Sequence, residues 1–71
     1  MNGPEKHSLT LHGHRTSVTL EPEFWAAFRA IAGAEGKALN QLAAEVDEGR
    51  GTANLASAIR VFVLRWYQAR G

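Results

Sequence analysis

Apolar and polar residues alternate along residues 15–20, and this pattern predicts a β-strand. One face of the strand carries Thr16, Val18 and Leu20. The other face carries Arg15, Ser17 and Thr19. Strand-forming residues begin earlier, at Leu9, but Gly13 interrupts them and predicts a break or bulge. No second strand is predicted within the chain, so we expect this strand to pair antiparallel with its copy in a second chain.

Apolar residues at helical spacing predict three helices after the strand. The first begins at Pro22 and ends near Glu35, because Gly36 suits the left-handed conformation that follows a helix. The second lies between Ala38 and Gly49, and the third spans residues 54–69 after a good N-cap residue, Asn54. The apolar faces are predicted to form the core and a dimer interface: Val18, Leu20, Phe24, Phe28, Ile31, Leu42, Val46, Ile59, Phe62 and Trp66.

The length of 71 residues fits one small domain. We expect residues 1–8 to form a flexible arm and residues 9–71 to form the domain. The chain has no cysteine, so neither a disulfide nor a thiolate site can stabilise it. A core this small is marginal alone, and the third helix is apolar over a broad arc, so both features favour a homodimer. The sequence shows no signal peptide and no membrane-spanning run, which predicts a cytoplasmic protein.

Charge is distributed unevenly although the net charge is only +1. Residues 21–50 carry a net charge of −3, whereas residues 51–71 carry +3 and no acidic residue. This segregation is compatible with one basic face that binds nucleic acid, or with ordinary solvated surface charge. Acidic residues at the end of the second helix, Glu45, Asp47 and Glu48, have no nucleophile or partner histidine to form a catalytic set, so we expect no enzyme.

Three histidines near the N-terminus raise the question of a metal site. His12 and His14 are two residues apart and would share one face of a strand, where two imidazoles could hold zinc or nickel. The polar segment around His7 and the glycine at position 13 instead indicate exposed histidines without a metal. We therefore predict no metal and no cofactor.

The order of strand, helix, glycine turn and helix resembles the ribbon-helix-helix family of DNA-binding proteins. The resemblance is carried by residues 15–20 (RTSVTL), 21–25 (EPEFW) and 36–40 (GKALN). The segment 54–64 (NLASAIRVFVL) is similar to a bacterial subfamily of this fold that has an additional C-terminal helix. The resemblance implies a mainly α, ribbon-helix-helix fold in which one strand pairs across a homodimer and two or three helices follow.

The resemblance also implies how the protein binds double-stranded DNA. Two strands from two subunits form a ribbon in the major groove, and alternate side chains contact base edges. These side chains are Arg15, Ser17 and Thr19. The N-terminus of the second helix contacts phosphate through Leu39 and Asn40, with Lys37 nearby. Ala38 departs from the family, which has Ser or Thr there, so one hydroxyl donor is lost.

Two registers and three functions remain open at this point. In the preferred register the helix after Gly36 is the family's second helix; in the other, residues 37–51 are an insertion and the helix after Asn54 takes that role. The favoured function is a DNA-binding transcriptional regulator, such as a repressor. The alternatives are the antitoxin of a toxin–antitoxin pair, or a protein-interaction module that has lost DNA binding and uses the third helix.

Overall fold

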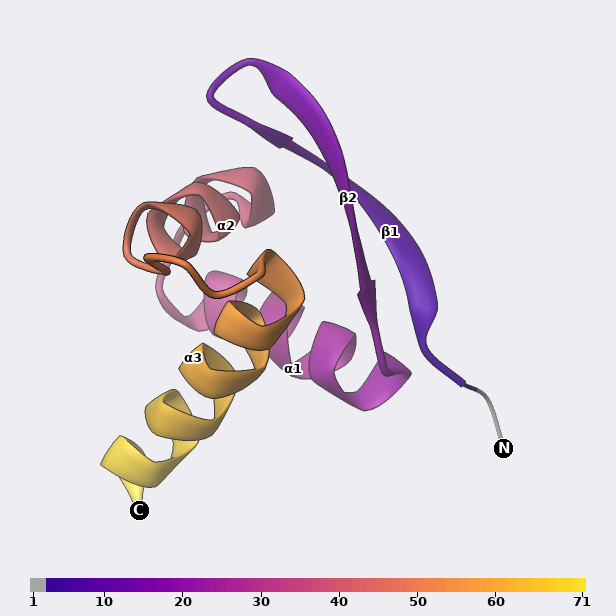
Figure 1. Cartoon of the computed structure of the whole chain (residues 1–71). Coiled ribbons are helices and arrows are strands. Elements are labelled where there is room, and N and C mark those ends of the chain that lie inside the picture. Colours follow the sequence, from indigo (N-terminus) through magenta and orange to yellow (C-terminus); the bar gives the residue numbers. More distant parts are fainter. Residues whose placement is uncertain (1–2) are drawn as a thin grey trace.

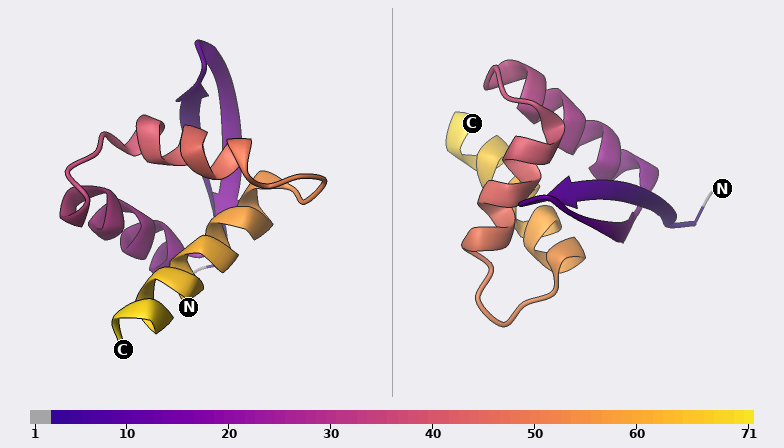
Figure 2. Two further views of the ribbon diagram at one scale, coloured as in Figure 1. Left: turned by 90° about the vertical axis from the view of Figure 1, so that its left-hand side faces the viewer. Right: turned by 90° about the horizontal axis from the view of Figure 1, so that it is seen from above.

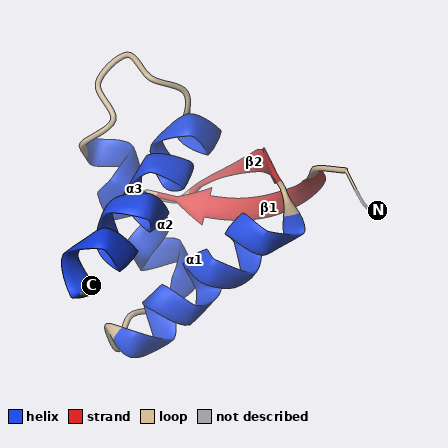
Figure 3. Cartoon of the chain, turned by 90° about the horizontal axis from the view of Figure 1, so that it is seen from below, coloured by secondary structure: helices blue, strands red, loops and turns tan. Residues whose placement is uncertain are grey.

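A computed structural model describes residues 3–71 as two strands followed by three helices (Figure 1). The elements are β1 (Glu5–Leu11), β2 (His14–Leu20), α1 (Pro22–Ala34), α2 (Leu39–Glu48) and α3 (Leu55–Arg70). The helices gather on one side of the two-stranded ribbon (Figures 2 and 3). This mainly α arrangement, a ribbon followed by helices, confirms the predicted fold class.

The ribbon is a hairpin within one chain, and this corrects the prediction of a single strand. β1 pairs antiparallel with β2 from Glu5 opposite Leu20 to Leu11 opposite His14. The interruption at Gly13 is the hairpin turn and not a bulge, because His12 and Gly13 both have positive φ, 52° and 79°. Two such residues form the primed turn that fits the twist of paired strands.

The N-terminal segment also differs from the prediction of a flexible arm over residues 1–8. The first two residues of that arm lie outside the described residues. Residues 5–8 belong to β1, where they pair with residues 17–20. The domain that the structure describes therefore begins before residue 9, and β2 already has one strand partner without a second chain.

The three helices follow the sequence prediction closely. Gly36 has φ 67° directly after α1, and the Asn54 side chain caps α3 by accepting a 2.8 Å hydrogen bond from the Ser57 N–H. Arg60 of α3 donates to both carboxylate oxygens of Glu21, at 2.8 and 3.3 Å, and so ties α3 to the start of α1. The cap thus fixes where α3 begins, and the ion pair connects α3 to the start of α1.

The core lies between the inner face of the hairpin and the helices. The strands contribute Leu9 of β1 and Val18 of β2 to this core. Thr16, which was predicted to share a face of the strand with Val18, is exposed near the turn. Other predicted core residues are buried: Leu20, Phe28, Ile31, Leu42, Val46 and Ile59. Three more are partly buried against this cluster: Phe24, Phe62 and Trp66. The core continues through side chains that the prediction did not include: Leu9, Leu11, Ala32, Ala43 and Val63.

A matched pair of substitutions in β1 tests whether this strand is part of the core. Leu9 is 2% exposed and its neighbour Ser8 is exposed on the opposite face. Leu9→Asp buries an unpaired carboxylate and is expected to cost several kcal/mol of unfolding free energy, on the order of 3 kcal/mol. Ser8→Asp places the same group in water and is expected to change stability by less than about 0.5 kcal/mol. Urea unfolding followed by circular dichroism measures both, and equal midpoints would contradict the hairpin.

Candidate functional site

The outward face of the hairpin is polar and carries no acidic side chain. β2 contributes the three residues predicted to contact DNA bases, Arg15, Ser17 and Thr19. β1 places a second row directly opposite them: Thr10, Ser8 and Lys6. All six side chains are exposed. One hairpin therefore presents two cations and four hydroxyl groups on a continuous surface.

The two cations on this face differ from most of the other basic side chains. Within residues 3–71, Lys6 and Arg15 form no ion pair. By contrast, ion pairs to acidic side chains hold Lys37, Arg50, Arg60 and Arg70. The hairpin face thus keeps its positive charge available for an anionic ligand, whereas the helices neutralise much of theirs.

The hydrogen-bond pattern shows that β2 has an open edge. In an antiparallel pair, residues alternate between N–H groups that point to the partner strand and N–H groups that point away from it. The Thr10 N–H donates to Asn40 Oδ1 at 3.1 Å, so it points away from β2. Its partner Arg15 and, by alternation, Ser17 and Thr19 direct their N–H groups to the outer edge of β2. None of these three N–H groups has a hydrogen-bond partner among residues 3–71.

The N-terminus of α2 lies beside β1. Leu42 is the first residue of α2 whose N–H bonds to a carbonyl, that of Ala38, so the N–H groups of Leu39 and Asn40 are free of helical partners. Ala38 provides no side-chain cap. The Asn40 side chain is occupied by the backbone of β1, which fixes the α2 N-terminus against the hairpin.

Lys37, predicted to lie near a phosphate, has a partner within the chain. Its Nζ donates to Glu45 Oε1 at 2.7 Å. This hydrogen bond, helped by the charges of Glu45 and Glu35, raises the pKa of the Lys37 ammonium. Lys37 therefore stays charged, but it must leave or share Glu45 to bind another anion.

The histidines are separated from one another. His7, predicted to be exposed, is half-buried and stacks on Trp25 with ring centroids 3.9 Å apart. His12 at the turn lies 3.5 Å from Glu48, and His14 is exposed. No group of three or more metal-binding side chains occurs within residues 3–71.

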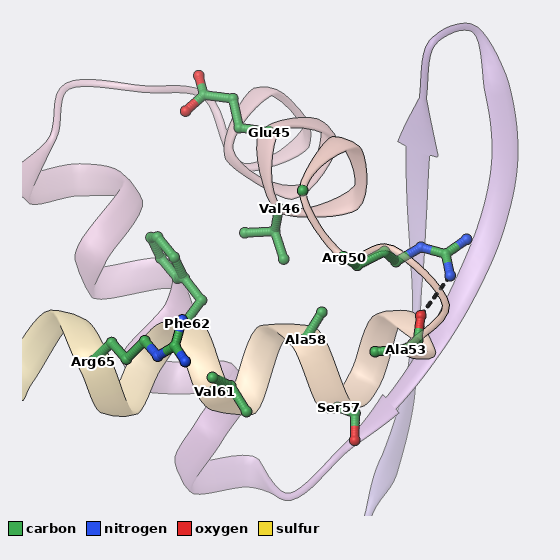
Figure 4. A pocket seen from close by; sticks show the side chains of 10 residues that line it. Glu45, Val46, Arg50, Ala53, Ser57, Ala58, Val61, Phe62 and Arg65 are labelled. Atoms are coloured by element: carbon green, nitrogen blue, oxygen red, sulfur yellow. Dashed lines mark hydrogen bonds between the residues drawn. The ribbon is translucent and has the colours of Figure 1, made fainter.

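A shallow hollow of about 440 Å³ lies between α2 and α3 (Figure 4). Val46 and Phe62 form part of its apolar lining, and Arg50 and Arg65 lie along it. The acidic residues of α2 all have a basic side chain nearby: Lys37 pairs with Glu45, Arg50 pairs with Asp47, and the His12 imidazole lies 3.5 Å from Glu48. Val61, which also lines the hollow, is exposed on α3 together with Leu64 and Tyr67.

The comparisons with known proteins identify the class of protein to which this fold and site belong. The family described as Ribbon-helix-helix domain matches residues 4–67, and the chain belongs to this family. Proteins of this family generally bind DNA as transcription regulators, usually as dimers. No curated protein and no solved structure matches the chain. None of the helices in residues 3–71 is long and apolar enough to cross a membrane.

The family match, over residues 4–67, spans both α2 and α3. It also includes β1, whose outward residues the sequence prediction missed. A signal for β1 was present, because apolar Leu9 and Leu11 alternate with polar Ser8 and Thr10 up to the turn. The match therefore treats the hairpin as part of the domain and not as an appendage.

The Lys37–Glu45 pair generates a prediction about titration. A raised pKa means that the pair stabilises the fold below the ordinary lysine pKa and that this contribution is lost as pH rises through the pKa of the folded protein. Glu45→Gln is expected to lower the pKa of Lys37 toward its usual range. Alkaline NMR titration of the lysine side chains measures this change, with Lys6 as the internal control. An unchanged Lys37 titration in the variant would contradict the pairing.

Proposed function

We propose that this protein is a transcriptional regulator that binds specific sequences of double-stranded DNA as a homodimer. The open edges of two β2 strands pair around a two-fold axis, and the resulting ribbon enters the major groove. The observation that carries this proposal is the acid-free, cationic outward face of the hairpin beside an unpaired edge of β2. Such a surface is complementary to the negative charge and the hydrogen-bonding edges of DNA.

In this arrangement the side chains of β2 read the bases. The Arg15 guanidinium can donate two hydrogen bonds to guanine O6 and N7, which is the commonest specific contact in the major groove. The hydroxyls of Ser17 and Thr19 can donate or accept, and the Thr19 methyl can contact a thymine methyl. These three side chains are exposed and have no hydrogen-bond partner within residues 3–71, so binding DNA does not require breaking internal contacts.

The α2 N-terminus contributes phosphate contacts. The free N–H groups of Leu39 and Asn40 and the positive end of the helix dipole favour an anion. Lys37 can bind a phosphate here only if the phosphate displaces Glu45 from the Lys37 ammonium or shares it. We therefore expect Lys37 to contribute less to DNA affinity than Arg15.

The dimer rests on the open edge of β2, whose unpaired N–H groups need a partner strand. The exposed apolar residues Val61, Leu64 and Tyr67 lie on α3 and are not part of this edge. The prediction of a dimer from a solitary strand no longer holds, because β1 occupies one edge of β2. The remaining open edge leads to the same expectation. A regulator of this kind acts where the DNA is, which fits the expected cytoplasmic location.

The exposed apolar side chains of α3 favour a second candidate function. Together with Arg65, they form a surface that a different protein could cover, as in an antitoxin that binds its toxin or an interaction module. A purified protein that shows no salt-dependent affinity for DNA would favour the interaction module over a regulator or an antitoxin.

The first experiment measures DNA binding and its specificity. The probes are a duplex selected by the wild-type protein from a randomised library and a scrambled duplex of the same composition. Fluorescence anisotropy at a series of salt concentrations should show affinity that falls with salt. Arg15→Ala should reduce discrimination between the duplexes by about 1–3 kcal/mol for each lost bidentate contact. An equal loss of affinity for both duplexes would mean that Arg15 contacts only phosphate.

The second experiment tests the β2 edge with two matched proline substitutions. Ser8 and Ser17 lie directly opposite each other, and both N–H groups point away from the hairpin. Proline is tolerated at such edge positions because no hydrogen bond within the hairpin is removed. Ser17→Pro blocks pairing between two β2 strands and should yield a folded monomer, whereas Ser8→Pro should remain a dimer. Sedimentation equilibrium measures the mass and circular dichroism the fold; a folded Ser17→Pro dimer would refute pairing through β2.

A further inference from the structure

We infer that β1 is a phosphate-binding strand, which lies over the walls of the DNA groove while β2 reads the bases within it. This inference rests on the proposed function. It assigns a role to outward residues of β1, which take no part in base reading by β2. The residues are Lys6, Ser8 and Thr10. It divides the outward face of the hairpin into an inner row for specificity and an outer row for affinity.

The width of the sheet is the first argument. Pairing through the open edge of β2 produces the strand order β1–β2–β2–β1 across two chains, because β1 already occupies the other edge. Neighbouring strands are about 4.8 Å apart, so the axes of the two outer strands are about 14 Å apart. The major groove of B-DNA is about 12 Å wide and admits a two-stranded ribbon. The central β2 strands therefore fit the groove, and each β1 strand lies at a groove wall, where the phosphates are.

The chemistry of the outer row is the second argument. Lys6 is exposed and has no ion pair among the described residues, and lysine binds phosphate as a compact point charge. Ser8 and Thr10 supply hydroxyl donors, which are common partners of phosphate oxygens. The only acidic residue of β1 is Glu5, which belongs to the inner face with His7 and Leu9. The outward row of β1 itself therefore carries no carboxylate.

The position of α2 is the third argument. The 3.1 Å hydrogen bond from the Thr10 N–H to Asn40 Oδ1 joins the outer edge of β1 to the first turn of α2. The helix N–H groups proposed to bind phosphate and the outward side chains of β1 therefore lie along the same edge of the sheet. An edge at which both elements favour anions matches one phosphate strand of the duplex.

A different use of the hairpin would make the opposite prediction. If the hairpin of a single chain entered the groove as a complete two-stranded ribbon, β1 and β2 would both face the bases. Lys6 would then read sequence in the same way as Arg15. The two arrangements differ in whether a change at Lys6 alters the DNA sequence that the protein prefers.

The experiment compares three variants of the full chain for salt dependence and for sequence preference. Lys6→Gln removes the cation of β1, Arg15→Ala removes the cation of β2, and Arg29→Gln removes an exposed cation of α1 as a control. Each variant and the wild type select duplexes from one randomised library. Each is also titrated by anisotropy against the duplex that the wild type selects, at a series of salt concentrations. Circular dichroism verifies that each variant is folded.

The expected result is a separation of the two readouts. Lys6→Gln should reduce the slope of log affinity against log salt by about two units, one for each chain of the dimer, and should select the same consensus sequence as the wild type. Arg15→Ala should lose preference at one or more positions of the consensus. Arg29→Gln should change neither readout.

The contradicting results distinguish the inference from the proposed function. A changed consensus for Lys6→Gln, with wild-type binding intact, means that β1 reads bases and overturns the inference alone. An unchanged salt slope for Lys6→Gln means that Lys6 does not contact phosphate, and it also overturns the inference alone. A wild-type protein that shows no salt-dependent affinity for any duplex overturns the proposed function and the inference together.

Discussion

The tight turn at His12 and Gly13 is the constraint on which the rest of the structure depends. It fixes the register of the hairpin, and a slip by one residue would move every side chain of a strand to the other face. With the observed register, Leu9 and Val18 enter the core while Lys6 and Arg15 face solvent. The same register decides which N–H groups are used within the hairpin and which remain at its edges. Core, candidate DNA surface and candidate dimer edge thus follow from one turn.

The helices contact one edge of the hairpin, that of β1, and leave the edge of β2 open. Asn40 of α2 accepts the Thr10 N–H and thereby occupies part of the β1 edge, whereas the outward N–H groups of Arg15, Ser17 and Thr19 in β2 find no acceptor within the described chain. Ion pairs also neutralise much of the positive charge of the helical part of the chain, as between Lys37 and Glu45 and between Arg60 and Glu21. The hydrogen bond from Arg60 is the main reason why the pKa of Glu21 is lowered. This pair therefore persists into mildly acidic solution. Free cations remain on the hairpin, where an anionic partner can reach them.

The sequence predicts the helices well and the ribbon only in part. Helical spacing, the glycine at position 36 and the capping residue Asn54 define α1 and α3 through local interactions, which a single sequence displays directly. β1 was missed because Lys6, His7 and Ser8 are not typical strand residues, and their strand conformation depends on pairing with β2. The hairpin turn is also hard to predict from the sequence, because His12 occupies its first position, where Asn or Asp is the usual signal.

The candidate site shows the same limit. Its outward residues on β2 follow from alternation, and the structure leaves these three residues exposed. The partners of Lys37 and Asn40 could not be predicted, because they connect residues that the fold brings together from α2 and β1. Long-range contacts of this kind depend on packing and not on local pattern.

The outward face of the hairpin is the surface that we propose to contact DNA. The most direct measurement is an NMR titration of isotopically labelled protein with a duplex that the protein itself selects, in which shifts of individual amide and side-chain signals locate the contact. If this face binds DNA, the shifts are largest at the first turn of α2 and at the six outward residues of the hairpin, with little change at the exposed apolar residues of α3. The six residues are Lys6, Ser8, Thr10, Arg15, Ser17 and Thr19. Shifts confined to Val61, Leu64 and Tyr67 of α3, with the hairpin signals unmoved, would contradict DNA binding by this face.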